Sequence, residues 1–287
     1  MHVYKQYDQA SLDSQYNNRL HVRGFADYLS RWELLSRETE NKLPVIKDIA
    51  YGNMQRETLD IFPAALPGSK TLVFIHGGYW QMLDKRMFHF VAGALHAYGV
   101  TTVLINYPLA PGASMDEIVV ACREAITWIY RNISRFNGDP GQLYVTGHSA
   151  GGHLAAMLLT TNWKLLNDDL PRGLLKGSCM ISGLFNLVPI QQSYLNQVLK
   201  MDLETANRNS PVRLEPKNFC PLIIAVGAAE TQEFNDQSKE LHAKWIDKGT
   251  EIEYLQLPQL NHFSIIESIR DPKSVLHLAM CEMMKLH

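Results

Sequence analysis

A glycine-flanked serine is the residue of this sequence best suited to nucleophilic chemistry. Ser149 stands at the centre of Gly-His-Ser-Ala-Gly, residues 147–151, which follows a short apolar run and precedes a helical pattern. At such a strand-to-helix turn a serine adopts a strained backbone conformation that exposes its Oγ. The flanking glycines let the strand and helix approach closely. We therefore predict that Ser149 is a nucleophile; the alternative is a glycine-rich turn that carries an incidental serine.

A second glycine-rich segment has the composition of an oxyanion-binding loop. Residues 76–80, His-Gly-Gly-Tyr-Trp, come directly after an apolar run. Paired glycines allow backbone N–H groups to point inward without obstruction, and such donors stabilise the negative charge that develops on an attacked carbonyl. We expect these donors to be the N–H groups of Gly78, Tyr79 and Ala150. His76 is expected to brace the loop rather than to react, and the alternative role for the glycines is packing alone.

A serine hydroxyl needs a neighbouring imidazole to accept its proton. Where the serine occupies a strand-to-helix turn of this type, the acid and then the histidine follow it along the chain. Among the eleven histidines, four come late enough to qualify. His242 and His277 fall within helical patterns, and His287 is the last residue. His262 occupies the loop after the last strand-like run, so we predict that it is the general base.

The acid that orients this histidine is expected in residues 227–236, the loop after the seventh strand-like run. Glu230 is the first carboxylate of that loop and is the predicted partner of His262. Glu233 and Asp236 remain alternatives, although both fit the first turn of the following helix, where acids interact favourably with the helix dipole. The other interpretation of Glu230 is a solvated loop carboxylate.

Positioning these residues requires strands that alternate with helices. Strand-like runs are predicted at Val45–Ala50, Thr58–Phe62, Thr71–Ile75, Thr101–Asn106, Leu143–Thr146, Lys176–Ile181, Leu222–Val226 and Glu251–Leu255. Helical patterns are predicted at Arg86–Tyr98, Met115–Arg135, Ala150–Thr160, Phe234–Asp247 and Lys273–Lys285. This alternation indicates an α/β fold with a mostly parallel, twisted, eight-stranded sheet covered by helices on both faces. The first two strands are expected to form a hairpin at one sheet edge.

Two segments fall outside this alternation and are expected to line the substrate pocket. Residues 1–44 form a predicted N-terminal extension with helices at Gln9–Leu20 and Phe25–Glu40, and residues 45–287 form one domain. Residues 186–218 are an irregular insertion within that domain. In open parallel sheets, ligands bind beyond the carboxyl ends of the strands, where such insertions lie. The side chains expected to contact the substrate are those of Tyr79, Trp80, Phe185 and Tyr194.

Composition excludes several classes of partner. With 27 basic and 29 acidic residues, the net charge of −2 favours neither nucleic acid nor an anionic membrane. The polar N-terminal residues do not resemble a signal peptide, and no apolar run is long enough to span a membrane. The four cysteines are scattered, without the spacing of metal ligands, so we expect reduced thiols in a cytoplasmic protein that needs no metal or cofactor.

The glycine-rich segments also carry a family resemblance. His76-Gly-Gly-Tyr-Trp80, Gly147-His-Ser-Ala-Gly-Gly152 and Asn261-His-Phe263 resemble the kynurenine formamidase (arylformamidase) branch of the α/β-hydrolases, over roughly residues 45 to 270. The resemblance implies an α/β-hydrolase fold and acyl transfer through Ser149, His262 and Glu230, with glutamate where the family usually has aspartate.

The expected activity is therefore that of a serine hydrolase acting on a small-molecule formamide or ester. An arylformamidase is the leading interpretation, a small-acyl carboxylesterase is the alternative, and a non-catalytic binding module is a remote one. The sequence leaves the oligomeric state open, with a homodimer among the options.

Overall fold

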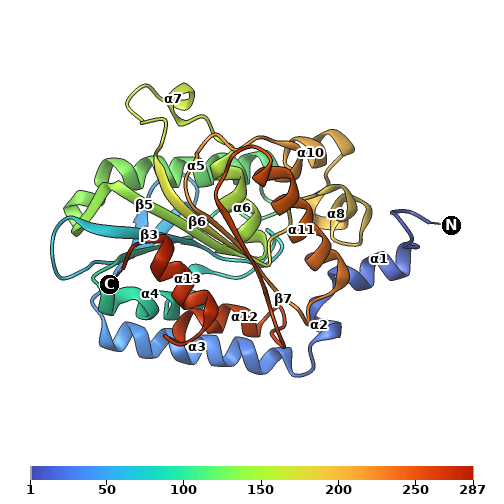
Figure 1. Cartoon of the computed structure of the whole chain (residues 1–287), viewed down its shortest axis with the longest axis horizontal. Helices are drawn as coiled ribbons and strands as arrows, with labels where there is room; N and C mark the ends of the chain where they lie inside the picture. Colours follow the sequence, from blue (N-terminus) through green and yellow to red (C-terminus); the bar gives the residue numbers. More distant parts are fainter. Residues whose placement is uncertain (1, 287) are drawn as a thin grey trace.

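An eight-stranded sheet forms the centre of the molecule in the computed structural model, which describes residues 2–286 (Figure 1). The strand order is β1-β2-β4-β3-β5-β6-β7-β8. The strands span β1 Ile46–Ala50, β2 Thr58–Phe62, β3 Ser69–Ile75, β4 Thr101–Ile105, β5 Gly138–His148, β6 Leu175–Ile181, β7 Leu222–Gly227 and β8 Ile252–Leu257. The predicted α/β-hydrolase sheet is confirmed, and all eight strands lie within a few residues of their expected positions.

The pairing of the strands follows from their sequences. β1 and β2 form the expected antiparallel hairpin at one edge, and β2 pairs antiparallel with β4, whereas every other neighbouring pair is parallel. The central strand β3 is apolar from Leu72 to Ile75, and these four residues have no exposed surface. Burial on both faces is typical of a strand at the centre of a parallel sheet.

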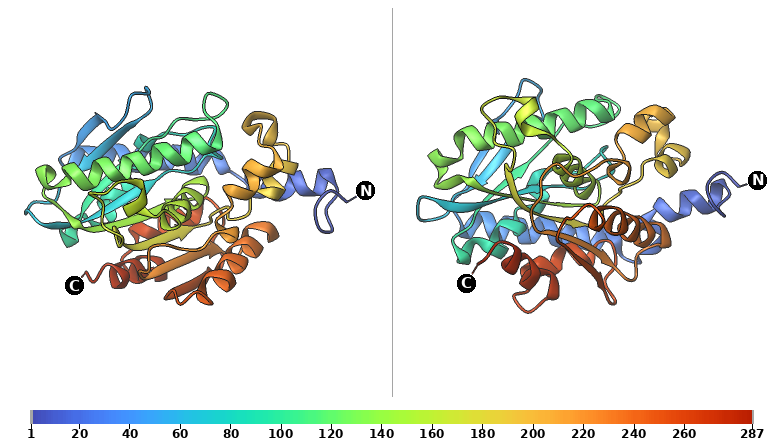
Figure 2. Two further views of the ribbon diagram at one scale, coloured as in Figure 1. Left: turned by 90° about the horizontal axis from the view of Figure 1, so that it is seen from above. Right: turned by 45° about the horizontal axis from the view of Figure 1, so that its top comes forward.

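Alternate residues of each strand face opposite layers of helices. Val73 and Ile75 of β3 belong to the core shared with α5 (Met115–Asn132), α6 (Ala150–Leu159) and α11 (Gln232–Ile246). Leu72 and Phe74 belong to the opposite core, shared with α3 (Phe25–Lys42), α4 (Phe90–Leu95) and α13 (Val275–Met283). The two helical layers lie on either side of the sheet in Figures 1 and 2.

The remaining helices are short. They are α1 Gln9–Tyr16, α2 Asn18–His21, α7 Trp163–Leu166, α8 Val188–Gln192, α9 Asn196–Leu199, α10 Leu203–Arg208 and α12 Ser264–Glu267, with 3-10 turns at Lys85–Phe88, His96–Tyr98, Ile133–Phe136, Pro211–Arg213 and Ser268–Arg270. None of the helices in the described residues is long and apolar enough to cross a membrane.

Three sequence expectations differ from these elements. The single helix expected at Arg86–Tyr98 is instead the short helix α4 between two 3-10 turns. The helix expected at Gln9–Leu20 is interrupted at Asn17, whose φ of −95° and ψ of 73° are not helical. The insertion at 186–218 is more regular than expected because it contains α8, α9 and α10. Local signals start two of these helices: a proline lies in the first turn of α8, and the Asp202 side chain accepts a hydrogen bond from the Thr205 amide to cap α10.

Two fully buried histidines pack beneath the carboxyl edge of the sheet. The His76 ring stacks on Tyr107 with 4.5 Å between ring centroids, and His153 bridges Trp80 and Asn209. His153 Nδ1 accepts from the Trp80 indole N–H at 3.2 Å, so its Nε2 carries the proton that it donates to the Asn209 carbonyl at 2.8 Å. Burial disfavours the charged ring and lowers the pKa of both histidines to about 4.

These lowered pKa values predict loss of stability in mild acid. Below about pH 6.5 the unfolded chain protonates both histidines, whereas the folded chain does so only near pH 4. The contribution is therefore complete above the unfolded pKa and is lost as the pH falls toward 4. We expect the free energy of unfolding to drop by about 2–3 kcal/mol per histidine between pH 7 and about pH 4.5.

Urea unfolding followed by circular dichroism at the two pH values measures this loss. A His153→Gln variant, whose amide offers both a donor and an acceptor, should show a smaller difference between the two pH values than the unsubstituted protein. Equal pH dependence in the two proteins would contradict the assignment of this contribution to His153.

Candidate active site

Ser149 occupies a sharp turn between β5 and α6. Its backbone has φ 58° and ψ −121°, a region that non-glycine residues rarely adopt. The turn depends on neighbouring glycines, because a Cβ on Gly151 would lie 1.9 Å from the Ile75 carbonyl oxygen and one on Gly147 would lie 2.1 Å from that of Gly151. The strained turn places Ser149 on the wall of a cavity, at the amino end of α6.

A hydrogen-bonded chain connects Ser149 to two residues from later loops. Ser149 Oγ lies 3.0 Å from His262 Nε2, and His262 Nδ1 lies 2.7 Å from Glu230 Oε2. The other carboxylate oxygen of Glu230 accepts from the Ser182 hydroxyl at 2.6 Å and from the Gly227 amide at 2.7 Å. An ionised carboxylate only accepts hydrogen bonds, so Nδ1 carries the imidazole proton and Nε2 is free to accept one from the serine.

The two alternative acids lie elsewhere. Glu233 is fully buried and accepts hydrogen bonds from Lys5 Nζ at 3.0 Å and from the Tyr16 hydroxyl at 3.2 Å. Asp236 is partly exposed and accepts from the Gln232 side chain. Of the three candidate acids, Glu230 is the one in hydrogen-bond contact with the imidazole that contacts Ser149.

The loop after β3 adopts positive φ angles at three successive residues: 109° at Gly78, 50° at Tyr79 and 59° at Trp80. A Cβ on Gly78 would lie 2.1 Å from the Met82 carbonyl oxygen, so this tight turn requires glycine. Within residues 2–286, the backbone N–H groups of Gly78, Tyr79 and Ala150 make no hydrogen bond. These amides belong to the two turns that border the cavity beside Ser149, and they are available to a ligand.

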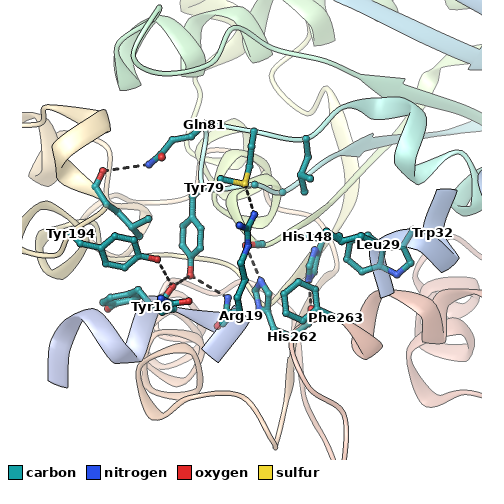
Figure 3. Close-up of a pocket in the computed structure, with 18 residues that line it drawn as sticks. Tyr16, Arg19, Leu29, Trp32, Tyr79, Gln81, His148, Tyr194, His262 and Phe263 are labelled. Atoms are coloured by element: carbon teal, nitrogen blue, oxygen red, sulfur yellow. Dashed lines mark hydrogen bonds between the residues drawn. The ribbon is translucent and has the colours of Figure 1, made fainter. Parts of the chain in front are cut away.

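A cavity of about 260 Å³ opens over Ser149 and His262 (Figure 3). The oxyanion-type loop, the N-terminal segment and the 186–218 insertion all contribute to its wall. Its lining comprises Tyr16, Asn17, Asn18, Arg19, Leu29, Trp32, Gly77, Gly78, Tyr79, Gln81, Met82, Leu83, His148, Ser149, Tyr194, Leu195, His262 and Phe263.

Of the four aromatic residues expected at the substrate, Tyr79 and Tyr194 line this cavity, but Trp80 and Phe185 do not. Both of the latter are fully buried. The Trp80 indole turns away to donate to His153 on α6. The Phe185 ring folds back over Gly183, where an added Cβ would lie 2.3 Å from it. They support the site from the core rather than contacting a ligand.

The N-terminal segment holds the Tyr79 side chain in place, which the sequence did not reveal. The Tyr79 hydroxyl donates to the Tyr16 carbonyl at 2.6 Å and accepts from the Asn18 amide at 3.1 Å. Trp32 of α3 also reaches the cavity, where its ring lies 6.0 Å from that of Phe263. No motif marks these residues; the signal was only the helical pattern of residues 1–44.

His148, which precedes the serine, is a second unanticipated member of the site. Its Nε2 lies 2.8 Å from the His262 backbone carbonyl, and the two rings are 4.7 Å apart between centroids. Burial, followed by the neighbouring His262, holds the pKa of His148 well below its usual value. His148 is therefore neutral at pH 7, and its N–H donates to the His262 carbonyl to fix the loop that carries that residue.

Comparison with known proteins identifies the family of the chain. The BD-FAE family matches residues 59–245. The kynurenine formamidase of Danio rerio is 33% identical over 99% of both chains, and that of Salmo salar is 34% identical over 83% of this chain and 81% of its own.

Solved structures show the same fold. A crystal structure from Silicibacter sp. tm1040, provisionally assigned as a thioesterase, is 28% identical with a TM-score of 0.84, covering 93% of this chain and 98% of its own. The esterase of Pyrobaculum calidifontis is 17% identical with a TM-score of 0.71, covering 91% and 93%. The fold, the sharp turn at Ser149 and these relatives agree: the chain is a hydrolase of the serine type and belongs to the kynurenine formamidase-like branch of the α/β-hydrolases.

Proposed function

We propose that the protein hydrolyses aryl formamides of the N-formylkynurenine type through a Ser149–His262–Glu230 triad and an acyl-enzyme. The observation that carries the proposal is the continuous hydrogen-bonded chain from Ser149 Oγ through His262 to Glu230. The substrate class is supported by the activity named for the Danio rerio and Salmo salar relatives. No metal or organic cofactor takes part in the proposed reaction.

In the first step, Ser149 Oγ attacks the formyl carbon while His262 Nε2 accepts the hydroxyl proton. Glu230 stabilises the resulting imidazolium and holds its orientation through the 2.7 Å contact with Nδ1. The carbonyl oxygen becomes an oxyanion, which receives hydrogen bonds from the amides of Gly78, Tyr79 and Ala150. Collapse of this intermediate breaks the C–N bond, and His262 returns the proton to the departing aniline nitrogen.

In the second step, water hydrolyses the formyl-enzyme. His262, again neutral, takes a proton from the water molecule, whose oxygen attacks the formyl carbon, and formate leaves as Ser149 regains its proton. An aniline is a weakly basic leaving group compared with an alkylamine, so machinery suited to esters is able to expel it. The same site is therefore chemically competent for both formamides and small esters.

The shape of the cavity favours an aromatic leaving group. A formyl group contains a single carbon and fills little of a space of about 260 Å³, so the leaving group must occupy most of it. Rings of Trp32, Tyr79, Tyr194 and Phe263 line that space. Aromatic side chains stack favourably on a planar anilide.

A carboxylesterase acting on small acyl groups is the second candidate. It is favoured by the cavity volume of about 260 Å³, which suits a compact ester as well as an anilide, and by the fold shared with the Pyrobaculum calidifontis esterase. The two candidates use the same nucleophile and base and differ in the bond that is broken fastest.

Relative kcat/KM values for N-formylkynurenine, p-nitrophenyl acetate and p-nitrophenyl butyrate separate these candidates. We expect the formamide to be preferred by about a hundredfold or more, because kynurenine is larger than p-nitrophenol and therefore makes more contacts with the leaving-group pocket in the transition state. Ser149→Ala should abolish turnover of all three substrates. Rapid ester hydrolysis with negligible release of kynurenine would instead make the protein a carboxylesterase.

The role of Glu230 is tested by Glu230→Gln, with Asp236→Asn as the matched control. The amide would still accept from Ser182 and Gly227, but it could not stabilise the imidazolium. We expect kcat to fall on the order of ten-thousandfold, as in other triads, whereas Asp236→Asn should stay within a few-fold of the unsubstituted enzyme. A Glu230→Gln effect below tenfold, or an equal loss in Asp236→Asn, would remove Glu230 from the triad.

A further inference from the structure

The side chains of residues 2–286 that line the active-site cavity include a positive charge but no negative one. Among the described residues that line it, Arg19 is the only arginine or lysine, and there is no aspartate or glutamate. Arg19 belongs to α2, and in Figure 3 it lies among the side chains that surround the cavity containing Ser149 and His262. The cavity therefore offers a fixed positive charge to any ligand that fills it.

The guanidinium of Arg19 is not neutralised by the protein. Its Nη2 donates to the Met82 sulfur at 3.1 Å, and its centre lies 5.3 Å from the Phe25 ring, but it forms no ion pair with any described residue. A thioether is a weak acceptor, so most of its five N–H donors are uncommitted. Two other exposed arginines, Arg131 and Arg208, are instead paired with aspartates through two nitrogens each.

The positive charge of Arg19 lies on the leaving-group side of the cavity. It lines the same space as the rings that would hold the leaving group, and a one-carbon formyl group cannot extend from Ser149 to fill that space. An anionic group that meets Arg19 must therefore belong to the leaving group. A planar guanidinium matches a carboxylate in shape and can donate two parallel hydrogen bonds to it.

We propose that Arg19 is a subsite for a carboxylate on the leaving group, so that the enzyme selects anionic aryl formamides over neutral ones of the same shape. This inference rests on the proposed formamidase function and identifies the residue that sets its substrate class. The carboxylate displaces the weak Met82 contact of the guanidinium, and no covalent step involves Arg19.

The test compares N-formylkynurenine with 2′-formamidoacetophenone, which has the same ring, formamide and ketone but lacks the amino-acid group. The measured quantity is the ratio of the two kcat/KM values. We expect Arg19→Gln to lower this ratio about tenfold or more, as a lost hydrogen-bonded charge contact does. Arg19→Lys should restore part of it, because the charge returns without the planar pair of donors.

Arg23→Gln is the matched control, since Arg23 is exposed, lies four residues away and does not line the cavity. Its ratio should equal that of the unsubstituted enzyme. Added salt should lower the preference of the unsubstituted enzyme for the anionic substrate and have little effect on that of Arg19→Gln, because Arg19 is exposed and its charge is screened by ions. An unchanged ratio in Arg19→Gln, or an equal drop in Arg23→Gln, would overturn the proposal.

Failure of the formamidase function would be recognised separately. If neither formamide is hydrolysed but esters are, the same comparison is made with 4-acetoxybenzoate and its methyl ester, in which the carboxylate again lies on the leaving group. A drop in their ratio for Arg19→Gln would then retain the subsite in an esterase. An unchanged ratio would reject it independently of the activity.

Discussion

The backbone conformation of Ser149 is the constraint on which the rest of the site depends. A φ of 58° at a non-glycine residue persists only where the surrounding structure enforces it. Here the enforcement comes from strand and helix backbones that approach within the distance allowed by Gly147 and Gly151. The parallel sheet then places the other components at the same edge, because the loops after β3, β7 and β8 carry the amides of Gly78 and Tyr79, the Glu230 carboxylate and His262.

Much of this arrangement could be predicted because short, contiguous segments of the sequence determine it. The strands are apolar runs bounded by turn residues, and the sharp turn at Ser149 and the paired glycines are contiguous segments whose backbone conformation follows from their sequence. The prediction that Glu230 is the partner of His262 needed only the end of one strand and the first acid after it, and the structure places the two side chains 2.7 Å apart. These features depend on short stretches of chain, so the sequence specified them closely.

What the sequence could not specify depends on contacts between distant segments. Tyr79 and Trp80 are adjacent, yet one side chain lines the cavity and the other packs against His153. Nothing in a row of aromatic residues says which of them turns inward. The contribution of Tyr16, Asn18 and Arg19 was equally hidden, because it depends on contacts of these residues with the distant loop that carries Tyr79 and Met82.

The N-terminal segment is attached to the domain in a different way from the strands of the sheet. It joins the domain through side chains, with Lys5 and Tyr16 meeting the buried Glu233 of α11, rather than through pairing with the sheet. Under the proposed function, the loops of the sheet carry out bond cleavage, while residues 16–19 of this segment contribute part of the cavity wall that a ligand would contact. Substitutions in that segment can change which ligand binds without altering the residues proposed to cleave the bond. Relatives that share the sharp turn at Ser149 therefore need not share a substrate.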